Sequence, residues 1–136
     1  MTIHFHFGPA SGGEPLPIIT LNLVDDITQA ATPMLTALVD TGADGTLVPR
    51  KILQDAGFRP NRQRRQLFSV QVGQPAETVL GYSVTVRIGN IELNEVDVYG
   101  SQTVNDVILG RNVLNRMVFT YNGPQQLFEL LDVDEW

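Results

Sequence analysis

A short apolar run that ends in an aspartate constrains this chain more than any other feature. Ala37-Leu38-Val39 has the composition of a buried strand, and Asp40-Thr41-Gly42 follows it directly. A carboxylate buried at the end of such a strand is costly unless hydrogen bonds compensate. Thr41 and the turn amides are the obvious donors, and Gly42 lets another backbone or a ligand come close. We therefore expect Asp40 to be a buried, hydrogen-bonded and functional carboxylate.

A second motif lies in the C-terminal half of the chain, at Val107–Leu114, where three aliphatic residues precede Gly110-Arg111-Asn112. Together with Leu38–Thr46, it resembles the paired motifs of the retropepsin family, the single-domain retroviral-type aspartic proteases. In that family the second motif is a strand that runs under the catalytic loop and then turns into a helix. The resemblance covers roughly residues 15–130.

This resemblance implies an all-β fold, a retropepsin-like closed β-barrel with a flap hairpin and one or two short helices. The 136 residues suffice for one compact domain and are too few for two. We expect an N-terminal strand or extension at residues 1–14, the protease domain at 15–131 and an acidic tail at 132–136.

Composition excludes several other functions. The net charge of −6 argues against a general nucleic-acid binder. The absence of cysteine excludes disulfides, thiolate nucleophiles and cysteine-ligated zinc. Residues 1–7 lack the basic and apolar regions of a signal peptide, and no apolar stretch is long enough for a membrane span. We expect a cytoplasmic protein with no cofactor or metal and with no nucleic-acid or membrane partner.

Apolar and polar residues alternate, or aliphatic residues run together, in eleven segments that predict strands. They are Ile3–Phe7, Ile18–Val24, Met34–Val39, Thr46–Val48, Leu67–Val72, Ala76–Leu80, Val84–Ile88, Ile91–Tyr99, Val107–Leu109, Met117–Tyr121 and Leu127–Leu131. The cluster from Gly8 to Gly13 should end the first strand. Helices are predicted at Arg50–Ala56, ended by Gly57, and at Val113–Met117, capped by Asn112.

Two pairs of polar residues invite a functional interpretation. His4 and His6 would share one strand face and could ligate a metal, but the chain has no third histidine. An exposed strand face at a chain end explains them better. Asp25 and Asp26 could be mistaken for a second catalytic carboxylate, but adjacent acids before a polar loop are more often solvated turn residues.

Two further motifs favour ordinary explanations. Asp55-Ala56-Gly57 imitates a second Asp-x-Gly, but it lacks a preceding aliphatic strand and falls at a helix end. Four arginines could bind an acidic peptide or a nucleic acid, although a solvated loop fits their surroundings better. These are Arg59, Arg62, Arg64 and Arg65.

The segments Leu67–Val72 and Ala76–Leu80 surround Gly73-Gln74-Pro75 and predict a hairpin. In the order of retropepsin elements, this hairpin is the flap that covers the substrate. That position implies substrate contacts from Val72, Gly73 and Gln74. The tip lacks the glycine-rich run of many retroviral flaps, so an ordinary hairpin that covers the core remains an alternative.

The family's catalytic roles can be transferred where residues match. Asp40 would be the catalytic carboxylate, and Thr41 would form hydrogen bonds across a dimer axis. Gly42 would offer its backbone to the carboxylate and the substrate. Gly45 stands where some retroviral enzymes carry a second acidic residue, so their specificity cannot be transferred.

The resemblance also implies supporting roles around this loop. Ala43 and Asp44 would contact the substrate. Asp44 would also pair with Arg111 beneath the site, and a bidentate pair would hold the loop to the last helix. Asn112 would belong to the same support.

Peptide hydrolysis by carboxylates requires two of them around a water molecule, one as base and one as acid. This chain supplies one suitable aspartate, so the sequence predicts a C2 homodimer that acts on a peptide or protein substrate. A peptide-binding or dimerisation module with weak or no activity is the main alternative. A carboxylate glycosidase is a distant third, because no pair of acids accompanies an aromatic sugar platform.

Overall fold

Strands dominate the computed structural model, which describes residues 2–10, 13–68, 75–131 and 136. The strands are β1 (Ile3–Ala10), β2 (Gly13–Asp25), β3 (Leu35–Val39), β4 (Thr46–Pro49), β5 (Asn61–Phe68), β6 (Glu77–Ile88), β7 (Ile91–Ser101), β8 (Val107–Leu109), β9 (Phe119–Asn122) and β10 (Leu127–Leu130). The helices are α1 (Arg50–Asp55) and α2 (Arg111–Leu114). Within these described ranges, no helix is long and apolar enough to cross a membrane.

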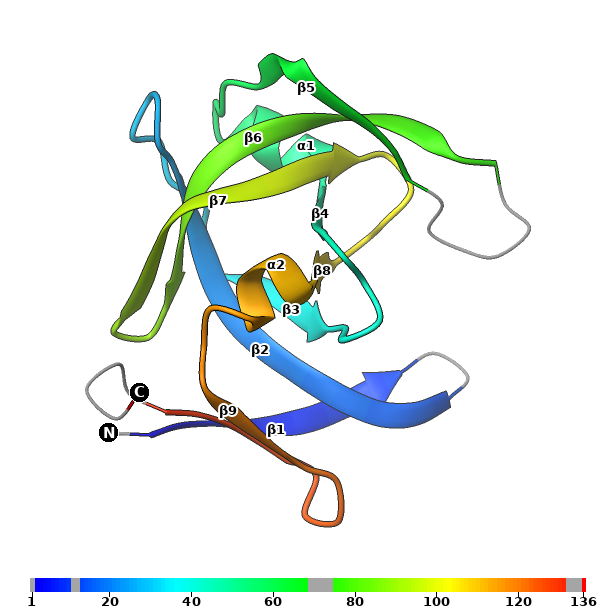
Figure 1. Ribbon diagram of the computed structural model, residues 1–136, viewed down its shortest axis with the longest axis vertical. Coiled ribbons are helices and arrows are strands. Elements are labelled where there is room, and N and C mark those ends of the chain that lie inside the picture. Colours follow the sequence, from blue (N-terminus) through cyan, green and yellow to red (C-terminus); the bar gives the residue numbers. More distant parts are fainter. Residues whose placement is uncertain (1, 11–12, 69–74, 132–135) are drawn as a thin grey trace.

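Six strands of the described chain close into a barrel (Figure 1). Around the barrel they follow the order β2, β6, β7, β4, β8 and β3, and β3 pairs with β2 again. Two of these pairings are parallel, β3 with β8 and β4 with β7. The closed barrel of strands with two short helices in the described residues agrees with the expected all-β architecture.

The longest strand, β2, connects the barrel to a second layer. Its alternate residues Ile19, Leu21 and Leu23 are at most 1% exposed and point into the core. Its first residues pair with β1, its middle residues, 18–21, pair with β3, and its last residues, 22–25, pair with β6, so one strand closes the barrel. Burial of alternate aliphatic side chains is therefore what fixes the register of this strand.

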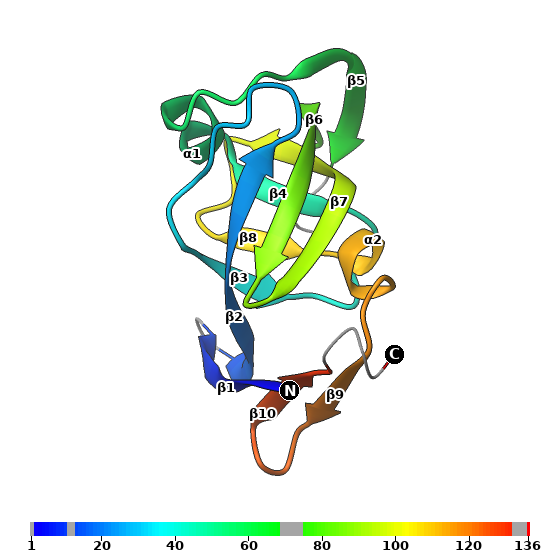
Figure 2. The same cartoon turned by 90° about the vertical axis from the view of Figure 1, so that its left-hand side faces the viewer.

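The chain ends form a small sheet that lies below the barrel in both views (Figures 1 and 2). In this sheet β1 lies between β2 and β10, and β9 pairs with β10. Phe128 of β10 is fully buried and packs against Phe119 of β9, while Phe7 makes an edge contact with Tyr121. These aromatic contacts join the first and last strands of the chain.

Several predicted boundaries were wrong. The Gly8-Pro9 segment continues β1 instead of ending it, since Gly8 pairs with Leu16. The two segments predicted at Ala76–Leu80 and Val84–Ile88 are one strand, β6, because it pairs with β5, β7 and β2 along its length. Local sequence does not reveal these partners.

Two further expectations were corrected. The arginine cluster was expected in a loop, which holds for Arg59, but the other three arginines lie in residues 61–68, which form β5 and pair with β6. The second helix begins at Arg111, and Gly110 occupies its N-cap position, so Asn112 lies within the helix and does not cap it. By contrast, α1 ends as predicted, with Gly57 at φ +78° and its amide donating to the Gln54 carbonyl.

The predicted hairpin between the two motifs exists as β5 and β6, which pair from Phe68 with Glu77 back to Asn61 with Gly81. The three residues assigned to its tip, Val72, Gly73 and Gln74, lie outside the described residues. Their assignment to the substrate therefore stays a prediction.

Candidate active site

The loop from Asp40 to Gly45 joins β3 to β4 at one end of the barrel (Figure 1). The Asp40 amide donates to the Leu109 carbonyl of β8 at 3.0 Å. The Gly42 amide donates to the Asp40 carboxylate at 2.9 Å, and the Ala43 amide donates to the Asp40 carbonyl at 3.2 Å. Alternate residues of β3, the strand that leads to Asp40, are buried, but Asp40 itself is exposed. The expected burial of Asp40 is thus wrong for a single chain, because the carboxylate projects beyond the apolar barrel end.

Gly110 lets the second motif approach this loop. A Cβ atom at Gly110 would lie 2.2 Å from the carbonyl oxygen of Gly45 and 3.0 Å from that of Ala43. The next two amides then donate to loop carbonyls, Arg111 to Ala43 at 2.9 Å and Asn112 to Asp44 at 3.2 Å. Only glycine fits so close a contact, and the start of α2 therefore clamps the loop by its backbone.

The side chains of Asp44 and Arg111 form the expected ion pair. The expected bidentate geometry is absent, however. One guanidinium nitrogen of Arg111 donates to the Asp44 carboxylate, and another donates to the Thr41 carbonyl at 2.8 Å. Both side chains are exposed, so the pair contributes little to the stability of one chain. Its effect is to fix the shape of the loop between Thr41 and Asp44.

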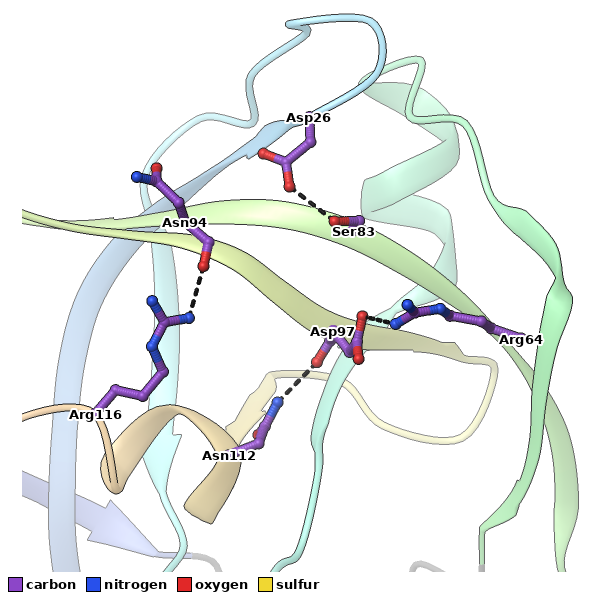
Figure 3. A network of polar contacts seen from close by, with 7 residues as sticks. All are labelled: Asp26, Arg64, Ser83, Asn94, Asp97, Asn112 and Arg116. Carbon is purple, nitrogen blue, oxygen red and sulfur yellow. Dashed lines mark hydrogen bonds and ion pairs between the residues drawn. The ribbon is translucent and has the colours of Figure 1, made fainter.

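A buried polar contact lies behind this loop. The Thr46 side chain is 1% exposed; its hydroxyl donates to the side-chain oxygen of Asn112 at 2.8 Å and accepts from the Gly110 amide at 3.1 Å. The Asn112 side-chain amide donates to the carbonyl of Asp97 on β7 at 2.8 Å (Figure 3). Sequence reasoning assigned no role to Thr46 or Asp97. Thr46 is the last residue of the first motif, and this position was the signal that could have indicated its role.

The return arm of the hairpin is held by Glu77. Its carboxylate accepts hydrogen bonds from the Ser101 hydroxyl and, at 3.2 Å, from the Gln102 amide. Burial raises the pKa of Glu77, but hydrogen bonds from Ser101, Gln102 and Thr103, together with the charge of Arg50, outweigh it and leave the pKa below its ordinary value of 4.5. An ionised Glu77 therefore holds β6 against the segment that leads to β8.

The other candidate residues lie apart from this loop. His4 and His6 are exposed on one face of β1, as expected, and His4 lies 3.9 Å from Glu129. Within the described residues, no group of three or more metal-ligating side chains gathers.

The expectation that Asp25 is solvated was wrong. Its side chain is 0% exposed and accepts hydrogen bonds from the Ile27 amide, the Thr28 hydroxyl and the Arg59 amide. Asp26 is partly buried and accepts from Ser83 and Thr85, both at 2.8 Å. Both aspartates therefore secure the turn after β2.

Comparison with known protein families identifies the family of this chain. The family model described as "gag-polyprotein putative aspartyl protease" matches residues 29–116, which include both the Asp40 loop and Gly110-Arg111-Asn112. The chain belongs to this aspartyl protease family. The matched region contains the barrel strands β3, β4, β6, β7 and β8, while β1, β9 and β10 lie outside it.

Two solved structures share the fold of this family member. A retropepsin-like aspartic protease from Rickettsia conorii is 17% identical, with a TM-score of 0.63, over 96% of this chain and 90% of that one. EIAV protease, solved in complex with the inhibitor HBY-793, is 17% identical, with a TM-score of 0.55, over 79% of this chain and 93% of that one. No match was found among curated proteins. At such identity these likenesses establish only the fold, which is the retropepsin-like fold expected from the sequence.

Proposed function

We propose that this protein is an aspartic endopeptidase that acts as a homodimer. The observation that carries the proposal is the exposed carboxylate of Asp40, presented by a loop that α2 and β8 hold in place. A catalytic group needs a fixed position and access to the substrate, and this loop provides both. Membership of the aspartyl protease family supports the same chemistry.

The proposed reaction uses two copies of Asp40 related by a twofold axis. Two carboxylates about 3 Å apart cannot both ionise, so the pair shares one proton. The ionised carboxylate removes a proton from a water molecule, which attacks the peptide carbonyl carbon. The protonated carboxylate donates its proton to the carbonyl oxygen, and the dyad then protonates the leaving amine as the C–N bond breaks.

Neighbouring residues would orient this dyad. The Gly42 amide already donates to one carboxylate oxygen of Asp40, and the other oxygen would bind water or substrate. Thr41 is exposed and would form hydrogen bonds across the axis, while Arg111 holds its carbonyl from behind. Ala43 and Asp44 would contact the substrate, and the Asp44 side chain stays accessible for this contact, because it is 87% exposed although it pairs with Arg111.

The substrate would be an extended peptide between the loop and the β5–β6 hairpin. Extended peptides are recognised by strand-like backbone hydrogen bonds, with side chains in alternating pockets. The hairpin would be the flap, with Val72, Gly73 and Gln74 as its contact residues. Recognition by backbone groups leaves the side-chain specificity open to several substrates.

Cleavage of an unfolded polypeptide tests this proposal. The wild-type protein should cleave in assays carried out between about pH 4 and 7, and the mechanism requires one protonated and one ionised carboxylate in the dyad. Asp40→Asn should abolish cleavage, and a pepstatin-type transition-state mimic should inhibit the wild type. Equal cleavage by both proteins, or none by a wild type shown to be dimeric, would favour a peptide-binding or dimerisation module instead.

A further inference from the structure

An irregularity in β5 lets one of its arginines contact a strand that is not its neighbour in the sheet. Asn61 pairs with Gly81 of β6, yet Arg65 pairs with its neighbour Leu80, so the intervening residues bulge out of the ladder. Bulges redirect side chains, and Arg64 lies in this one. Its guanidinium forms an ion pair with Asp97 on β7 (Figure 3), although β6 lies between β5 and β7. The ion pair therefore ties together two strands that are not neighbours.

Gly81 makes this crossing possible. A Cβ atom there would lie 2.8 Å from the Cβ of Arg64 and 3.2 Å from the Tyr99 ring. Since neither contact is with the flexible end of a side chain, a larger residue would displace β5. The glycine on β6 and the bulge on β5 thus form one arrangement, which brings Arg64 to Asp97.

Asp97 also touches the active-site support. Its main-chain carbonyl accepts the side-chain amide of Asn112 at 2.8 Å, while its carboxylate accepts Arg64. The same Asn112 binds Thr46 through its side chain and the Asp44 carbonyl through its backbone amide. Figure 3 shows Asp97 between Arg64 and Asn112. A continuous chain of polar contacts therefore connects the outgoing arm of the hairpin to the catalytic loop.

The same sheet contains a matched ion pair that lacks these connections. Arg87 of β6 pairs with Glu92 of β7 at 2.9 Å across the hairpin turn between the two strands. The side chains are 46% and 55% exposed, against 48% and 42% for Arg64 and Asp97. The two pairs differ mainly in location, so Arg87 provides an internal control.

We propose that Arg64 is a positioning residue, which holds β5 against Asp97 of β7 and so prearranges the hairpin for binding an extended peptide. This role rests on the proposed peptidase function. A prearranged hairpin loses less conformational freedom when peptide binds, which strengthens binding. The dyad lies on a separate loop, so the chemical step does not depend on Arg64. Loss of the ion pair should raise KM and leave kcat nearly unchanged.

The expected change is small but measurable, because exposed ion pairs contribute modestly. Arg64→Gln should raise KM about threefold and accelerate amide hydrogen exchange in residues 61–68 by a similar factor. Arg64→Lys should restore much of both, since it keeps the charge. Asp97→Asn should reproduce Arg64→Gln, and the double variant should be no worse than either single variant, because they remove the same interaction.

The experiment compares these variants with Arg87→Gln in peptide cleavage and in hydrogen exchange followed by mass spectrometry. Added salt should raise the wild-type KM toward that of Arg64→Gln more than it raises the KM of the variant itself. Identical behaviour of Arg64→Gln and Arg87→Gln would overturn the proposal, as would a fall in kcat at constant KM. A wild type without peptidase activity would overturn the proposed function and the effect on KM, whereas exchange in β5 would still decide whether Arg64 holds that strand.

Discussion

Two aspartates in this chain end similar strands and meet opposite surroundings. Asp25 ends β2, is fully buried, and accepts three hydrogen bonds from its own chain. Asp40 follows β3, is exposed, and accepts one from Gly42 at 2.9 Å. Each is followed within three residues by a threonine, yet only Thr28 donates to its aspartate. From the sequence, Asp40 was expected to be buried and Asp25 to be solvated, which is the reverse of the observed arrangement.

The difference separates a structural carboxylate from one available for chemistry. The donors around Asp25 satisfy its charge inside the fold, and one of them arrives from Arg59, far along the chain. The exposed carboxylate of Asp40 accepts the Gly42 amide at one oxygen and keeps capacity for further hydrogen bonds. A carboxylate in that condition can accept a second subunit, a water molecule and a substrate.

The largest contrast should appear in activity. Asp40→Asn should lower kcat by about a thousandfold or more, because it removes the group that exchanges protons with the water. Its thermal unfolding should match that of the wild type, since the exposed side chain stabilises little. Cleavage assays and calorimetry on the same sample measure both properties. Strong destabilisation by this substitution would mean that Asp40 is structural, like Asp25.

Asp25→Ala should show the opposite pattern. It leaves buried donors without an acceptor and should lower the free energy of unfolding by about 3 kcal/mol. Activity per folded molecule should be retained at temperatures where the variant is folded. Asp26→Ala is the matched control, and its effect should be smaller because the Ser83 and Thr85 hydroxyls can turn to water. Denaturant unfolding measures the difference; equal losses from the two variants would contradict the assigned role of Asp25.

Asp44→Ala tests the support of the Asp40 loop. Both partners of the Asp44–Arg111 pair are exposed, so a single chain should lose less than about 1 kcal/mol of stability. Dimer affinity and activity should fall together by about tenfold, because Arg111 then holds the Thr41 carbonyl alone and the loop loosens at the proposed interface. Sedimentation velocity and cleavage assays should report this change. An unchanged dimer would remove the role of Asp44 in assembly.

The smallest effect is expected at Glu77, whose burial is intermediate between that of Asp25 and that of Asp40. Its pKa is lowered in the folded state, so it contributes stability that is fully present above pH 4.5 and is lost as the pH falls below that value. Glu77→Gln should be less stable than wild type near neutral pH, and the two stabilities should converge under acid conditions. Unfolding curves across this range check the prediction. A constant difference at all pH values would exclude ionisation as the cause.

The parts of the site that sequence reasoning anticipated are those encoded by contiguous residues. An aliphatic strand before Asp-Thr-Gly, and another before Gly-Arg-Asn, are visible in the sequence. They correctly predicted β3 and β8, and the family resemblance that they carry implied the contact between Asp44 and Arg111. The closed barrel was implied by the resemblance to retropepsins that these two motifs carry.

The parts that were missed depend on partners distant in sequence. No local pattern shows that the Arg59 amide reaches Asp25, or that Asn112 binds Thr46 and Asp97 instead of capping a helix. The arginine-rich β5 lacks clear apolar alternation in its sequence. It is a strand because it pairs with β6. Asp40 is exposed because the barrel ends there, which the apolar run before it does not reveal.

Mixing of subunits tests the central claim most directly, namely that each active site needs Asp40 from two chains. Wild type and Asp40→Asn are mixed at constant total concentration, allowed to exchange subunits, and assayed for cleavage. Activity should follow the square of the wild-type fraction, so that an equal mixture retains about a quarter of the wild-type activity. Retention of about half, as for chains that act independently, or of about three quarters, as for a shared site that one Asp40 completes, would contradict the account.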